Sequence, residues 1–363
     1  MAKTRILLTG ADSFTGSHIL AQLLSHDTVS VRAVLKSAEG AHELQKQYHR
    51  MPASSLDFVT VFERELLIPG IFNDPLHDLS DPFHAIVHTL GISPSDDADC
   101  LARFIKYETD TVIGFLRSIQ ENSPTVSRVV IVTSLIPFAR WLSDPLVDRN
   151  FGRPTDDHCH SRLGDAEHIL ATSQASNNIV NDAVLAWTKQ SGAQFDVTVI
   201  TAPSVYGPTV HPLENSSGLT ETNRRIWNIC SNEPLDQTVP PPYGINHFSD
   251  VRDVADAVVR AIFIERASGK RLVVSAGVMP SGSEIAQFLA AQFPELQGRI
   301  RIDESPQRQA QYDETSLDFL DTYLMATILG ITQLRSAEIT LTDTVRQMLD
   351  LQQRKARASI TQT

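Results

Sequence analysis

The chain has 363 residues, and its 31 basic and 43 acidic residues give a net charge of −12, which argues against a nucleic-acid or anionic-membrane partner. A hydrophobic content of 42% with 20% charged residues is ordinary for a globular protein long enough for one large α/β domain and a smaller lobe. No apolar stretch has the length of a membrane span, and a strand is expected where a signal peptide would lie. Three scattered cysteines exclude a disulfide framework. We expect a cytoplasmic protein, monomeric or homodimeric, without a metal and acting on a small molecule.

A strand, a glycine turn and a helix follow one another near the amino terminus. Residues 6–8 form an apolar run, and apolar residues recur at helical spacing over residues 19–24. Such a unit directs backbone N–H groups and the positive end of a helix toward a pyrophosphate. Ser13 stands where the middle glycine of the usual pattern belongs, so its side chain is expected to weaken binding. The predicted pyrophosphate site consists of Gly10, Ser13, Phe14, Thr15 and Gly16.

Residues 29–36 alternate like a second strand and end on a lysine. At this point of a dinucleotide fold an acidic residue holds a free ribose 2′-OH, whereas a 2′-phosphate requires cations. Arg32 and Lys36 share one side of a period-2 strand, which favours NADP over NAD. The alternative is that both are solvated surface cations.

Further strands are expected at residues 58–62, 85–89, 129–134, 197–200 and 272–274, with amphipathic helices between several of them. This alternation predicts an α/β fold with a doubly wound parallel sheet, the Rossmann architecture, and a smaller, mostly helical C-terminal lobe. Ligands gather at the carboxyl ends of such strands. We therefore add Glu65 and Leu66, in a turn expected to contact adenine, and Leu90 and Thr133, at strand ends, to the predicted cofactor site.

The predicted nucleotide-binding domain comprises residues 1–202 and 246–275, and the substrate lobe comprises residues 203–245 and 276–350. Residues 351–363 are expected to be a polar tail. Residues 135–165 carry no regular pattern and are expected to form a long loop over the mouth of the site. A helix follows, with its apolar face predicted at residues 179, 180, 183, 184 and 187.

Several motifs occur in the order typical of one family: TGADSFTGSHI, VRAVLK, RVVIVTS, PSVYGP and HFSDVRDVADAVVRAI. In these motifs the chain resembles extended short-chain dehydrogenases/reductases of the NAD-dependent epimerase/dehydratase type. The nearest branch holds dihydroflavonol reductases, cinnamoyl-CoA reductases and fungal aldehyde or ketone reductases. The segment YDETS, near the carboxyl end, is also similar to that branch. The resemblance implies a nicotinamide cofactor and an organic carbonyl substrate beneath the smaller lobe.

The catalytic pair of that family is absent. Its reaction rests on a tyrosine and a lysine four residues later, one helical turn apart and both facing the cofactor. None of the six tyrosines has a lysine four positions on. Counting back from Trp187 and the loop at 203–208 assigns the tyrosine position to Ala175 and the lysine position to Ile179. The family's serine falls on Leu135, or on Ser134 after a shift of one residue.

Other groups could carry a proton. The candidates are Ser134, His160, His168 and Tyr206, since histidine titrates near neutral pH and Tyr206 is expected beside the nicotinamide. A solvated role for the histidines and a packing role for Tyr206 are the alternatives. Three functions stay open: an NADP(H)-dependent reductase with a non-standard mechanism, a non-redox isomerase, dehydratase, lyase or cyclase on the same scaffold, and a non-catalytic NADP-binding sensor or scaffold. The cofactor site is expected to be weak or vestigial.

Overall fold

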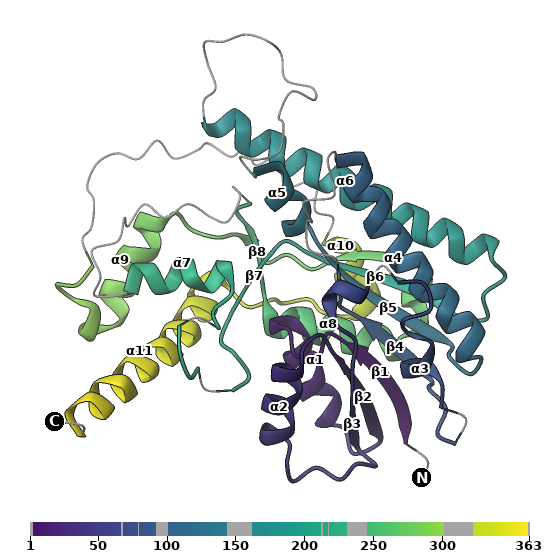
Figure 1. The fold of residues 1–363 in the computed structure, drawn as a ribbon. Helices are drawn as coiled ribbons and strands as arrows, with labels where there is room; N and C mark the ends of the chain where they lie inside the picture. The colour runs from purple at the N-terminus through teal and green to yellow at the C-terminus, as the bar shows by residue number, and fades with distance from the viewer. Residues whose placement is uncertain are drawn as a thin grey trace.

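A seven-stranded parallel sheet forms the centre of the molecule (Figure 1), in the order β3-β2-β1-β4-β5-β6-β9. The computed structural model describes residues 3–66, 68–78, 80–91, 101–143, 162–211, 213–216, 218–230, 245–300 and 322–361. The strands of this sheet are β1 (Thr4–Thr9), β2 (Val29–Leu35), β3 (Leu56–Thr60), β4 (Ala85–His88), β5 (Arg128–Ser134), β6 (Asp196–Ala202) and β9 (Arg271–Val273). The chain reverses its direction of winding between β1 and β4, which is the topological switch point. The predicted doubly wound α/β fold is confirmed.

Helices cover both faces of this sheet because its strands are apolar on both sides. In β1, Ile6 and Leu8 belong to one hydrophobic core while Leu7 belongs to the other. The first core includes residues of α1 (Phe14–Leu24), α2 (Ala38–Gln47), α8 (Val251–Phe263) and α10 (Tyr323–Leu329). The second includes residues of α3 (Asn73–Leu76), α4 (Leu101–Asn122), α5 (Ile136–Ser143) and α6 (Arg162–Gln190). Short 3₁₀ turns are η1 (Glu63–Glu65), η3 (Glu265–Ala267) and η4 (Pro294–Leu296).

A smaller lobe has its own core and its own three-stranded sheet, in the order β10-β8-β7. Its elements are β7 (Ser204–Tyr206), β8 (His247–Asp250), β10 (Gly277–Val278), α7 (Glu221–Cys230), α9 (Gly282–Gln292) and α11 (Ala337–Thr361). In Figure 1 the helices α7, α9 and α11 lie together at one side of the large sheet. Among the described residues no helix combines the length and apolar character that a membrane crossing requires.

The boundaries differ from the expected ones in three places. Strand β8 lies in the small sheet, whereas the sequence predicts that residues 246–275 belong to the nucleotide-binding domain. The expected polar tail from residue 351 continues α11 as far as Thr361, and Leu351 is buried in the lobe core. Residues 136–143 of the expected loop form α5, while residues 144–161 lie outside the described part.

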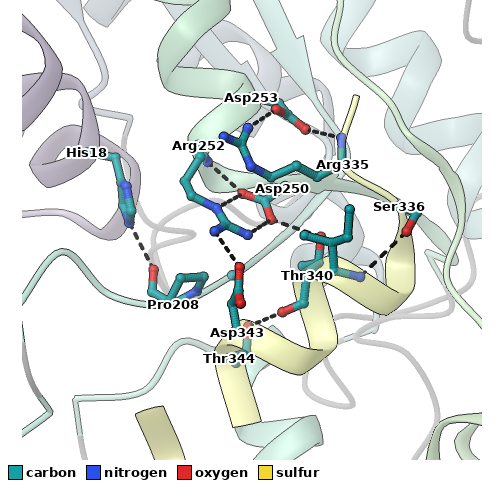
Figure 2. A network of polar contacts seen from close by, with 12 residues as sticks. His18, Pro208, Asp250, Arg252, Asp253, Arg335, Ser336, Thr340, Asp343 and Thr344 are labelled. Carbon is teal, nitrogen blue, oxygen red and sulfur yellow. Dashed lines mark hydrogen bonds and ion pairs between the residues drawn. The ribbon is translucent and has the colours of Figure 1, made fainter. Parts of the chain in front are cut away.

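A polar network joins the large domain to α11 (Figure 2). Asp250 caps α8 and is fully buried, and its carboxylate accepts hydrogen bonds from the Arg252 guanidinium, with Nη2 at 2.7 Å. Thr340 Oγ1 donates to the same carboxylate at 2.8 Å, and Arg252 Nη1 pairs with Asp343 at 2.7 Å. The motif HFSDVRD therefore supplies a largely buried clamp that ties α11 to the start of α8.

Candidate functional site

A cavity of about 500 Å³ opens at the carboxyl ends of the central strands, beside the switch point between β1 and β4. The glycine turn, the ends of β4, β5 and β6, and the middle of α6 all contribute to its wall. The wall residues used below are Ser13, Phe14, Thr15, His88, Leu90, Thr133, Ser134 and Asn177. Ligands bind at this place in open α/β sheets, so the cavity is the candidate active site.

The glycine turn is built as the sequence predicts. Gly10 has φ +68°, a conformation that L side chains rarely adopt, and its N–H donates to Val34 O at 2.8 Å. Gly16 packs against the turn so closely that a Cβ there would lie 2.0 Å from Gly10 O. Both glycines are therefore required for the turn and for helix packing.

Ser13 behaves differently from the expectation that its side chain would obstruct a pyrophosphate. It has φ −80°, serves as the N-cap of α1, and its Oγ accepts the N–H of Gly16 at 3.0 Å. The side chain thus folds back onto its own helix. The N–H groups of a first helical turn have no intrahelical partner, and those of Phe14 and Thr15 remain available among the described residues. With no acidic residue in that turn, the helix start fits a pyrophosphate with one N–H fewer than usual.

His88 lies beneath the turn, at the end of β4. Its Nδ1 is 2.9 Å from Thr9 Oγ1 and its ring stacks on Phe115 at 4.3 Å between centroids. Its buried Nε2 has no hydrogen-bond partner in the described part of the chain. Burial lowers the pKa of His88 to about 3, so the ring is neutral at physiological pH. It cannot act there as a protonated acid.

The two expected phosphate-binding cations separate in the structure. Arg32 Nε pairs with Asp57 at 2.6 Å and Arg32 Nη2 with Asp78 at 2.9 Å, and its side chain is only 15% exposed. Lys36 is exposed at the carboxyl end of β2. Four residues of strand span about 13 Å, so the two cations do not meet one phosphate. The structure does not support the expected phosphate-binding role of Arg32, because its charge is already paired with two partly buried carboxylates.

The remaining predicted cofactor residues divide in two groups. Leu90 and Thr133 line the cavity, and Thr133 Oγ1 lies 3.0 Å from Thr201 Oγ1. Glu65 lies in η1, while Leu66 is 4% exposed and packs in the second core rather than in the cavity wall.

Helix α6 presents a different face to the cavity from the predicted one. Ala175 and Ile179 are exposed, Ile179 to 55%, so the positions counted back from Trp187 do not face a cofactor. Ser173 and Asn177 are buried, four residues apart, and Asn177 lines the cavity. Ser173 and Asn177 each lie two positions before the predicted pair, a shift that turns a helix by about 200°.

Ser134 and Asn177 meet at the cavity wall. Asn177 Nδ2 donates to the carbonyl oxygen of Ser134 at 3.4 Å, and Asn177 Oδ1 accepts from Asn181 Nδ2 at 2.7 Å, which fixes the amide orientation. Ser134 Oγ accepts the N–H of Ile136 at 3.2 Å, and no described residue accepts its hydroxyl hydrogen, which can therefore point at a ligand. Leu135, the other candidate for the family's serine position, is buried in a small apolar cluster.

Two of the other proton-carrier candidates can be placed in part. Tyr206 is 1% exposed, does not line the cavity, and its hydroxyl lies 3.4 Å from Arg225 Nη1. Burial raises the pKa of Tyr206, so its structural role beneath the lobe is the better supported one. His160 lies outside the described residues, and of His168 only its place in α6 is described.

No family model matches the chain. An uncharacterized oxidoreductase of Saccharomyces cerevisiae is 28% identical and covers 96% of this chain and 98% of its own length. A ketoreductase of Aspergillus niger is 25% identical over 83% of this chain and 86% of its own. The solved structure of yeast methylglyoxal/isovaleraldehyde reductase complexed with NADPH has a TM-score of 0.71 at 22% identity, covering 96% and 99% of the two chains. The resemblance to extended short-chain dehydrogenases/reductases is confirmed. The tyrosine–lysine pair of that family is absent from this sequence, and Ser134 and Asn177 line the cavity wall.

Proposed function

We propose that this protein is an NADP(H)-dependent reductase of a small organic carbonyl compound that works without the tyrosine–lysine pair. One observation carries the proposal: a single cavity joins the helix start that fits a pyrophosphate to two hydrogen-bond donors, Ser134 and Asn177. The relatives named as a ketoreductase and an NADPH-bound reductase support the cofactor and the reaction class.

The cofactor, when bound, supplies a hydride to the carbonyl carbon. Phe14 and Thr15 would hold its pyrophosphate through their N–H groups, with Leu90 and Thr133 in the cavity wall beside it. The hydroxyl of Ser134 and the amide of Asn177 would bind the carbonyl oxygen and stabilise the negative charge that develops on it. Neither group releases a proton at neutral pH, so the proton reaches the product oxygen from water.

The orientation of Asn177 is the chain's own contribution to this chemistry. Because Asn181 donates to Asn177 Oδ1, the Asn177 NH₂ group is directed away from α6 toward Ser134 and the cavity. A buried pair of asparagines one turn apart therefore serves to present a donor.

The test is NADPH oxidation, followed by absorbance, with a panel of small ketones and aldehydes. Loss of one oxyanion donor costs on the order of 100-fold in turnover, so Ser134→Ala and Asn177→Ala should each lose that much with cofactor affinity retained. Asn178→Ala, on the same helix but outside the cavity wall, is the matched control and should keep full activity. If Asn177→Ala also keeps full activity, these donors do not carry the reaction.

A second candidate function rests on the same donors. Two neutral hydrogen-bond donors that can stabilise an enolate also suit a non-redox isomerase, dehydratase or lyase. Turnover of a carbonyl compound in the absence of any nicotinamide would favour it. Nucleotide binding without turnover of any substrate would favour the sensor or scaffold alternative.

A further inference from the structure

Asp12, in the glycine turn, reaches away from the cavity to the carboxyl end of β2. Its two carboxylate oxygens accept the N–H of Lys36 at 3.3 and 3.2 Å, and Oδ2 accepts the hydroxyl of Ser37 at 3.4 Å. Ser37 is the N-cap of α2, so the carboxylate lies at the positive end of that helix.

The backbone of α2 leaves room for this carboxylate. Gly40 lies in the first turn of α2, and a Cβ at that position would come within 2.4 Å of Asp12 Oδ2. The close approach of Asp12 to α2 is therefore possible because residue 40 has no Cβ. The hydrogen bonds from Lys36 and Ser37 hold the negative charge at this place.

The location matters for the adenosine end of a dinucleotide. In doubly wound folds the 2′ position of the adenosine ribose lies at the carboxyl end of the second strand, where a carboxylate accepts a 2′-OH and cations accept a 2′-phosphate. In this chain Arg32 is paired with Asp57 and Asp78, so the cation left at the strand end is Lys36. Asp12 faces it from the turn, and Glu39 adds a second acidic residue in the first turn of α2.

We infer that Asp12 is a specificity-determining residue: its carboxylate occupies the position of the 2′-phosphate and lowers the affinity for NADPH relative to that for NADH. The inference rests on the proposed cofactor site and deepens it. The pyrophosphate of a dinucleotide fits the start of α1. A 2′-phosphate, in contrast, would be repelled by the Asp12 carboxylate, which accepts the hydrogen bonds that the phosphate would need. An NADPH molecule must displace Asp12 or bind against its charge.

The experiment is calorimetric titration of the full chain with NADPH, NADH, 2′,5′-ADP and 5′-AMP. Asp12→Asn removes the charge and keeps an acceptor, and Asp12→Ser is the second variant should the first be poorly folded. Asp27→Asn is the control: Asp27 is an exposed carboxylate just before the start of β2, and its substitution makes the same change of net charge. Removing one negative charge close to a phosphate should increase the affinity for NADPH and 2′,5′-ADP about tenfold, and by less at high salt. The affinities for NADH and 5′-AMP should not change.

Each outcome decides something. An equal change for all four nucleotides, or the same gain from Asp27→Asn, would overturn the role of Asp12 while leaving the reductase proposal intact. No binding of any nucleotide by the native chain and all variants would remove the cofactor proposal itself, and the role of Asp12 with it.

Discussion

Replacement of Arg252 by alanine tests the clamp between the large domain and α11. Arg252 is the cation for the fully buried Asp250, and it also pairs with Asp343 on α11. The variant leaves Asp250 with the N–H of residue 252 and the hydroxyl of Thr340 as its partners. Removing one partner of a buried ion pair costs about 3–5 kcal/mol, and we expect the low end because the Arg252 side chain is 22% exposed.

The assay is thermal unfolding followed by intrinsic fluorescence. For a chain of this size a loss of about 3 kcal/mol corresponds to a fall in Tm of roughly 4 °C. Arg346→Ala is the matched control: Arg346 pairs with the same Asp343 at 3.5 Å but is 63% exposed, so it should change the Tm by less than about 1 °C. Equal Tm values for the two variants would refute the clamp.

The pH dependence gives the same prediction an independent readout. Burial acts to raise the pKa of Asp250, but hydrogen bonds and the charge of Arg252, with Thr340, hold it below its ordinary value. A lowered folded-state pKa stabilises the protein above the ordinary carboxyl pKa, and this stability is lost as the pH falls through the folded value. The difference in Tm between native protein and Arg252→Ala should therefore shrink as the pH falls from 7 to below about 4.

Three further predictions concern the site. Lys36→Gln should lower the affinity for NADPH severalfold without changing the affinity for NADH, whereas Arg32→Gln should leave both affinities unchanged and lower the Tm. Calorimetric titration and thermal unfolding together check this. Weaker NADPH binding in Arg32→Gln would contradict it. Ser13→Gly frees the N–H of Gly16, so calorimetry should show an equal gain in affinity for NADPH and NADH. The loss of the N-cap should cost the helix a few tenths of a kcal/mol. Unchanged affinity would mean that this N–H does not reach the pyrophosphate. Tyr206→Phe should retain turnover in the NADPH assay, because the hydroxyl lies outside the cavity wall, and a large loss would return Tyr206 to the list of proton carriers.

The fold could be predicted because its signals are local. The run at residues 6–8, the glycine turn and the helix after it are specified by neighbouring residues, and β1, α1 and the turn form as expected. The motif at residues 247–262 likewise contains its own N-cap, Asp250, and the apolar face of α8. The absence of a tyrosine followed four residues later by a lysine is a property of the chain itself and needs no structure.

The placement of α6 could not be predicted because a helix turns by about 100° per residue. Apolar residues occur on more than one side of α6, so the pattern around Ile179 and Trp187 did not fix which face is buried. Only packing against α4, α5 and β6 shows that Ser173 and Asn177 point inward and Ile179 outward.

The sequence by itself determined the doubly wound fold, the glycine turn and the loss of the usual catalytic pair, since each depends on residues close together in the chain. The tertiary structure decided which side chains meet: Arg32 with Asp57 and Asp78, Asn177 with Ser134, and Asp12 with the start of α2. The physical reason is that periodicity gives the side of an element on which a residue lies. The partner there comes from a distant segment, and only the packed structure brings the two together.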